Sequence, residues 1–178
     1  TQRGTNLEKN GVQINTCEHV LAAVYALGID NIIIEINAPE PPIMDGSSIH
    51  FIEALEKGGL LVQDATREEY IVKEIISYVD KESGSEIILM PADEYQVTTI
   101  VDFGTKVLGT QNASLNRLSD FKKEIAAART FSFLHEIEML LDNNLIKGGD
   151  LNNAIVYVDK EISEETTEKL KRVFDKPN

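Results

Sequence analysis

Residues 16–34 read TCEHVLAAVYALGIDNIII, and this stretch decides the fold class because a helical pattern passes directly into a strand pattern. Thr16 offers a side-chain oxygen at a helix start, and Gly28 stands where a left-handed C-terminal cap is expected. Residues 31–37 then read as a buried strand rich in isoleucine. The helical spacing itself comes from four apolar residues: Val20, Leu21, Val24 and Leu27. We therefore expect an α+β chain.

Outward from this stretch, turn and cap signals divide the chain into further helices and strands. We expect strands over residues 11–14, 70–79, 85–90, 95–103 and 153–159. We expect helices from Ser47 and Ser48 to Gly58, over 120–128 with Ser119 as its cap, over 134–141, and from Ser163 to about residue 173.

The two halves of the chain share a helix-to-strand connection. DNIII at residues 30–34 has a counterpart in NNAIV at residues 152–156. Two related α/β modules explain this echo, and so does convergent design of any such connection, so the sequence leaves both explanations open. The composition turns polar and charged around residues 63–69, which predicts a boundary near Ala65 and modules over 1–65 and 66–178.

Composition limits the classes of function. The 178 residues are 42% apolar, enough for a core, and carry a net charge of −13, which disfavours nucleic acid as a partner. A small anionic ligand stays compatible with this charge, because a few basic groups can bind a phosphate. The sequence contains no apolar run long enough for a transmembrane segment and no secretory signal. A single cysteine, Cys17, excludes an internal disulfide and favours a cytoplasmic location.

Glu18 and His19 are the most interesting candidates for catalysis or metal binding in this sequence. They fall in the first turn of the expected helix, where the helix dipole favours an ionised carboxylate and a neutral imidazole that can bind a metal. A carboxylate beside a metal-bound water is the usual arrangement for hydrolysis by a general base. A surface pair near a helix cap is the alternative. His50 and His135 each precede a glutamate by three residues, a spacing that more often marks a solvated helix face.

Common catalytic signatures are missing from the sequence. The pattern H-E-x-x-H fails at Met139, and no phosphate loop, dinucleotide turn or serine nucleophile elbow is present. Cys17 adjoins Glu18, but neighbouring helical residues point about 100° apart, so we expect a small buried side chain there and not a nucleophile.

Seven short motifs give the chain a resemblance to one known enzyme family over essentially its whole length. They are TCEHVLAA at 16–23, LGIDN at 27–31, PIMDGSS at 42–48, ARTFSF at 128–133, IE at 137–138, GG at 148–149 and NAIV at 153–156. The chain resembles UDP-3-O-acyl-N-acetylglucosamine deacetylase. This resemblance implies two related α/β sandwich modules with helices packed between two sheets. It also implies a cytoplasmic zinc hydrolase that releases acetate from a UDP-linked acylated glucosamine in the committed step of lipid A synthesis.

The same resemblance assigns roles to three residues. It makes His19 a zinc ligand, Glu18 the general base and the Thr130 hydroxyl a donor to the tetrahedral oxyanion. The other two zinc ligands and the general-acid histidine have no match here, so we expect them beyond Asn178. The family's N-terminal strands are expected before Thr1, which would make this the central portion of the enzyme, truncated at both ends.

The first consequence of these departures concerns the activity of the chain. By itself the chain should be inactive. Residues 159–177 resemble, more loosely, the form of the enzyme that is fused to a downstream hydroxyacyl-carrier-protein dehydratase. The alternative to the deacetylase is a zinc-free α/β binding or scaffold module that kept the fold and lost catalysis, and the joint presence of Glu18, His19 and Thr130 argues against it.

Overall fold

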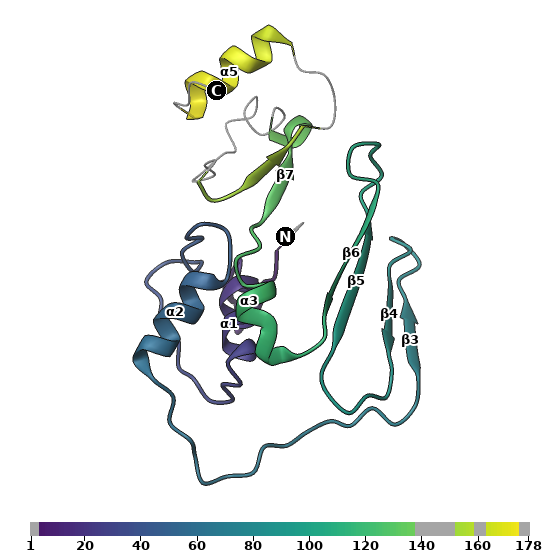
Figure 1. The fold of residues 1–178 in the computed structure, drawn as a ribbon. Coiled ribbons are helices and arrows are strands. Elements are labelled where there is room, and N and C mark those ends of the chain that lie inside the picture. The colour runs from purple at the N-terminus through teal and green to yellow at the C-terminus, as the bar shows by residue number, and fades with distance from the viewer. Residues whose placement is uncertain (1–3, 138–151, 159–162, 175–178) are drawn as a thin grey trace.

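The structure is a computed structural model that describes residues 4–137, 152–158 and 163–174 (Figure 1). It confirms the α+β class, because helices and small sheets both contribute. The elements in chain order are β1 (Leu7–Lys9), β2 (Val12–Ile14), α1 (Glu18–Ala26), α2 (Ile49–Gly58), β3 (Ile76–Val79), β4 (Glu86–Leu89), β5 (Val97–Asp102), β6 (Thr110–Leu115), a 3-10 turn (Leu118–Asp120), α3 (Phe121–Glu124), β7 (Phe131–Phe133), β8 (Ile155–Tyr157) and α5 (Glu164–Phe174). Within the described ranges, no helix is long and apolar enough to cross a bilayer.

Hairpins account for most of the strand pairing in the described residues. β1–β2, β3–β4 and β5–β6 are antiparallel two-stranded sheets, whereas β7 and β8 pair in parallel. Lys9 pairs with Val12, and the two residues between them, Asn10 and Gly11, have φ of 54° and 78°. Positive φ at both central residues is the type I′ geometry that Asn-Gly favours, so this turn sets the register of β1 and β2.

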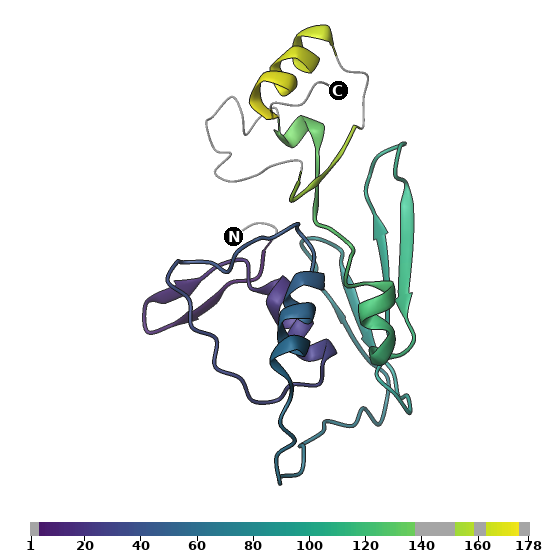
Figure 2. The same ribbon diagram turned by 60° about the vertical axis from the view of Figure 1, so that its left-hand side comes forward.

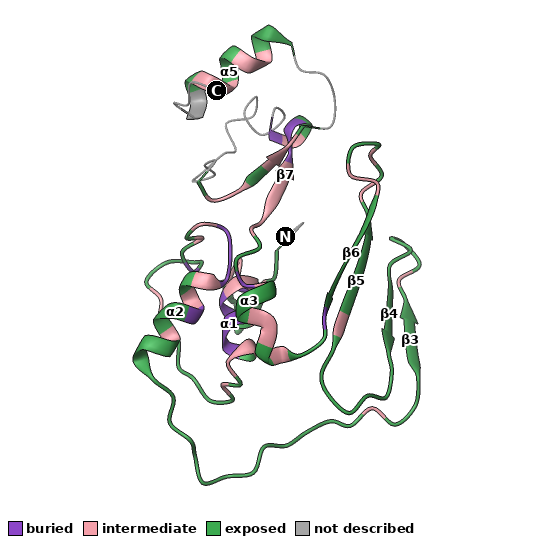
Figure 3. Cartoon of the chain, in the orientation of Figure 1, coloured by how far each residue is buried: buried purple, intermediate pink, exposed green. Residues whose placement is uncertain are grey.

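A small helical core joins the two sides of the predicted boundary. Ala23 of α1, Ile52 of α2 and Ala126 just after α3 are buried together, at 0%, 0% and 1% exposure. Lys122 of α3 adds an ion pair to Glu56 of α2, with 2.6 Å between Nζ and Oε2. Most buried residues lie around these helices, a second buried group lies at Phe133, Leu134 and Ile137, and β3 to β6 are largely exposed (Figure 3). The division into modules 1–65 and 66–178 stays a prediction.

Residues 31–37 form no strand, so that prediction was wrong. Ile33 is 88% exposed, and the Asn31 side chain donates to Gln63 Oε1 at 2.6 Å. Isoleucine-rich sequence favours a strand only where a neighbouring strand completes the backbone hydrogen bonds, and none of the described strands lies in register here. The strand predicted over 70–79 is likewise confined to β3, the part that β4 pairs.

Several predicted helix starts also differ in the structure. The N-cap of α1 is Cys17 and not Thr16, and the N-cap of α3 is Asp120 and not Ser119. Residues 120–128 form only the short helix α3. The chain leaves the helix after Glu124, and the Ala126 carbonyl accepts a hydrogen bond from Ser48 N. Local cap signals therefore placed the start of these helices to within one residue and overestimated the length of α3.

The remaining elements agree with the sequence patterns more closely. Gly28 has φ of 66° after α1, and Ser163 Oγ accepts from Thr166 N at 3.1 Å at the start of α5, so both cap predictions are confirmed. The strand predicted over 153–159 is shorter in the structure, where it is β8. The residues of β8 are exposed or half-buried. Of the helix predicted over 134–141, residues 134–137 are helical, and the rest lies outside the described residues.

Candidate functional site

The N-terminus of α1 presents Glu18 and His19 as its first two residues. Cys17, 3% exposed, fixes this end because its N–H donates to the Thr5 carbonyl at 3.0 Å. Thr5 N in turn donates to Glu18 Oε2 at 2.9 Å. The Glu18 carboxylate thus accepts one backbone N–H at the N-terminal end of α1.

The chain enters α1 through a strained residue. Thr16 has φ of 55°, in the left-handed region that a β-branched side chain rarely adopts. Its hydroxyl donates to Glu40 Oε2 at 3.1 Å, and Asn15 N donates to the Pro39 carbonyl at 2.9 Å. The loop at 39–40 therefore holds the backbone in a conformation that costs about 1–3 kcal/mol, and such strain often accompanies functional sites.

His19 lies half-buried, one helical turn before the buried Ala23 and on the same face of α1. Among the described residues, its imidazole has no hydrogen-bond or ion-pair partner, so its chemistry fits a single metal ligand. No group of three His, Cys, Asp or Glu side chains that could hold a metal ion gathers within the described ranges. The described residues therefore fit one ligand of a zinc site and not a full set.

Thr130 lies between α3 and β7, with its backbone bonded on both sides. Its N–H donates to the Gly46 carbonyl at 2.7 Å, and its carbonyl accepts from Ile155 N of β8 at 2.9 Å. The neighbouring Arg129 donates from Nε to the Asp45 carbonyl at 2.6 Å. Two segments about eighty residues apart in sequence thus meet at the 45–46 turn.

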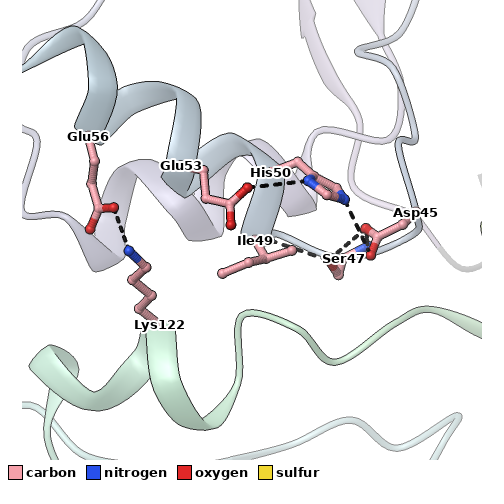
Figure 4. A network of polar contacts seen from close by, with 7 residues as sticks. All are labelled: Asp45, Ser47, Ile49, His50, Glu53, Glu56 and Lys122. Carbon is pink, nitrogen blue, oxygen red and sulfur yellow. Dashed lines mark hydrogen bonds and ion pairs between the residues drawn. The ribbon is translucent and has the colours of Figure 1, made fainter.

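Asp45 organises this turn and the start of α2 (Figure 4). Its Oδ1 accepts from Ser47 N at 3.1 Å and from Ser47 Oγ at 2.7 Å, and Ser47 Oγ accepts from Ile49 N at 3.3 Å. His50 of α2 lies with Nε2 3.6 Å from Asp45 Oδ2 and Nδ1 3.5 Å from Glu53 Oε2. Burial raises the pKa of the Asp45 carboxyl, but hydrogen bonds from Ser47 and the nearby His50 outweigh it, so the pKa lies below its ordinary value.

The N-terminal ends of α1 and α2 and the segment that leaves α3 for β7 lie at the same end of the helical core (Figure 1 and Figure 2). Thr130 ends that segment, and the hydrogen bond from its N–H to the Gly46 carbonyl ties it to the turn before α2. Among the described residues, no hydrogen bond or ion pair joins Thr130 to either of them. The structure thus places Glu18 and His19 in the first turn of α1 and ties Thr130 to the turn before α2.

The other two histidines lie outside this arrangement. The 3.5 Å contact between His50 and Glu53 occurs on an exposed helix face, as the spacing indicated. His135 stacks on Phe133, with ring centroids 5.5 Å apart, and Glu138 lies outside the described residues. The contacts of Asp45 and Gly46 with residues 129–130 were not foreseen from the sequence. The Asp-Gly pair, which is typical of turns, was the one available signal.

Comparison with known proteins identifies the family. A family model described as UDP-3-O-acyl N-acetylglycosamine deacetylase, LpxC, matches residues 1–173. The chain belongs to the LpxC family. The family resemblance carried by the seven motifs is therefore confirmed.

Individual LpxC relatives differ in what they are named. The chain is 48% identical over 170 residues to a bifunctional enzyme LpxC/FabZ of Porphyromonas gingivalis, covering 96% of this chain and 37% of the relative. A protein of the same name from Bacteroides thetaiotaomicron is 44% identical over 178 residues, covering 100% and 39%. A UDP-3-O-acyl-N-acetylglucosamine deacetylase of Syntrophotalea carbinolica is 40% identical over 157 residues, covering 88% and 50%. The chain thus spans half or less of the length of these curated relatives.

Proposed function

We propose that this chain carries part of the active site of a zinc-dependent deacetylase. The reaction is hydrolysis of the N-acetyl group of UDP-3-O-acyl-N-acetylglucosamine, with release of acetate, as the committed step of lipid A synthesis. The observation that carries the proposal is the placement of Glu18 and His19 at the start of α1 in a member of the LpxC family. The names of the relatives supply the substrate.

In this proposal His19 contributes one ligand to zinc. A bound zinc ion acidifies water and polarises the amide carbonyl in such hydrolases. Glu18 takes the proton of the attacking water, for which an ionised carboxylate is required. Its hydrogen bond from Thr5 N, 2.9 Å long, is accepted by Oε2 and leaves the other carboxylate oxygen, Oε1, to accept that proton.

Thr130 has a separate role at the acyl carbon. As water attacks, negative charge develops on the amide oxygen, and the Thr130 hydroxyl donates a hydrogen bond to it. The support is the backbone of Thr130, which is held from both sides by Gly46 and Ile155 while no hydrogen bond occupies its hydroxyl among the described residues. A donor fixed before the reaction is the arrangement that lowers such a barrier most.

The proposal extends to parts of the enzyme outside these 178 residues. Two further zinc ligands and the general acid come from beyond them, so the chain by itself is inactive. Two of the relatives carry the name LpxC/FabZ, and we propose the same fusion, to a downstream dehydratase, for this protein. The one cysteine of these 178 residues, Cys17, is buried and free, which is compatible with the reducing cytoplasm, where we place the enzyme.

Glu18→Gln in the protein expressed from its whole reading frame tests the role of the general base. We expect zinc content to stay at the wild-type level and kcat for acetate release to fall about 10²- to 10⁴-fold. The reason is that the side-chain amide of the introduced glutamine cannot accept a proton from water. Glu8→Gln, on exposed β1, is the matched control and should keep kcat. Near-normal kcat in Glu18→Gln, or loss of zinc, would show that Glu18 has another role. A wild-type protein that neither binds zinc nor releases acetate would instead support the scaffold alternative.

Thr130→Val tests the oxyanion role, since valine keeps the branched shape and removes the donor. We expect kcat to fall by about 10²-fold with little change in KM, because the hydrogen bond forms only as the charge develops. Thr99→Val on exposed β5 is the matched control. An effect confined to KM would contradict the assignment.

A further inference from the structure

Three chain segments converge at Gly46. Its carbonyl accepts from Thr130 N, and its own N–H donates to the Ile43 carbonyl at 2.9 Å, which closes the turn. Gly46 has φ of 84°, and a Cβ built on it would lie 2.1 Å from the carbonyl oxygen of Asn153, just before β8. Only glycine allows this approach, because other side chains disfavour the backbone conformation and would also collide with backbone.

The same close approach orients the side chain of Thr130. The Thr130 methyl carbon, Cγ2, lies 3.1 Å from the position where a Cβ of Gly46 would be. The methyl and hydroxyl groups of threonine share one carbon, so a methyl held against Gly46 also fixes the direction of the hydroxyl. The rotamer of Thr130 therefore depends on where the 45–46 turn lies.

Asp45 holds that turn in place from two directions. Its carboxylate accepts two hydrogen bonds from Ser47, which is fully buried, and so ties the turn to the start of α2. Its carbonyl accepts from Arg129 Nε at 2.6 Å, next to Thr130. Ser48 N adds a bond to the Ala126 carbonyl at 3.0 Å, so the turn and the 126–130 segment form one hydrogen-bonded unit.

From this geometry we infer that Asp45 is a positioning residue for the deacetylase reaction: its carboxylate fixes the turn that sets the rotamer of the Thr130 hydroxyl. The inference rests on the proposed oxyanion role of Thr130. Misplacement of a catalytic group by about 1 Å can lower the rate 10²-fold. We therefore expect loss of the Asp45 carboxylate to lower kcat strongly, but by no more than loss of the Thr130 hydroxyl does.

The test is a double-mutant cycle in the protein expressed from its whole reading frame, with acetate release from UDP-3-O-acyl-N-acetylglucosamine as the assay. Asp45→Ala should lower kcat about 10- to 100-fold and leave KM and zinc content unchanged. In a Thr130→Val background it should cost less than about 3-fold, because the group that it positions is already gone. Asp45→Asn keeps an oxygen acceptor for Ser47 and should recover most of the rate.

Asp80→Ala is the matched control. Asp80 makes the same kind of turn, with hydrogen bonds from the Ser83 N–H and hydroxyl, but in the β3–β4 hairpin. Its loss removes equivalent turn chemistry away from Thr130 and should leave kcat unchanged.

A second readout reports on geometry without activity. In protein labelled at the threonine methyl groups, the Thr130 resonance, assigned by its loss in Thr130→Val, should report one rotamer in the wild type and averaging in Asp45→Ala. An unchanged rotamer, or equal losses of kcat from Asp45→Ala in both backgrounds, overturns the inference while leaving the role of Thr130 intact. Full kcat in Thr130→Val would overturn the oxyanion role itself, which distinguishes the two failures.

Discussion

Replacement of Ile52 by alanine tests whether the three helices share one core. Ile52 is fully buried against Ala23 and Ala126. The substitution removes three carbons, which at about 0.8 kcal/mol each gives roughly 2.4 kcal/mol of lost transfer free energy. The two alanine neighbours are too short to fill the space, so a cavity term of about 1–2 kcal/mol adds to it. The free energy of unfolding should therefore fall by about 4 kcal/mol.

Urea unfolding of the 178-residue chain, followed by far-UV circular dichroism, measures this loss. Ile33→Ala is the matched control, because it deletes the same atoms at a residue that is 88% exposed, and it should cost less than about 0.5 kcal/mol. If Ile52→Ala does not fold, Ile52→Val, which removes one carbon, should still cost about 1 kcal/mol. Equal effects at positions 52 and 33 would refute the core assignment.

Two further predictions concern the pKa of Asp80 and the retention of zinc by the 178-residue chain. Hydrogen bonds from Ser83 lower the pKa of Asp80 from its ordinary 3.8, so the ionised carboxylate stabilises the hairpin above about pH 4, and this is lost as pH falls through the lowered folded-state pKa. Ser83→Ala should raise the Asp80 pKa toward 3.8 in a carboxyl ¹³C titration, and an unchanged or lower value would contradict the cause. The 178-residue chain, with His19 as one ligand, should lose zinc to a chelator; stoichiometric zinc measured afterwards by atomic absorption would implicate His50 or His135.

The elements that sequence predicted best are those with local causes. The Gly28 cap and the Ser163 cap each depend on residues within one turn, so the sequence contains everything that determines them. The strand predicted over 31–37 has a non-local requirement, a partner in register, which no pattern inside those seven residues can supply. Thr16 fails as a cap for a related reason, because Glu40, twenty-four residues away, binds its hydroxyl.

The residues of the candidate site show the same difference between local and non-local causes. Glu18 and His19 are adjacent in sequence, so the resemblance to a family was enough to single them out and α1 was enough to place them together. Thr130 is different, because the direction of its hydroxyl depends on contacts with Gly46, more than eighty residues earlier. Sequence names such a residue, but only the meeting of the two segments shows what holds it. A side chain at the entry to a short strand is positioned by the segments that contact it, and for Thr130 those are the 45–46 turn on one side and β8 on the other.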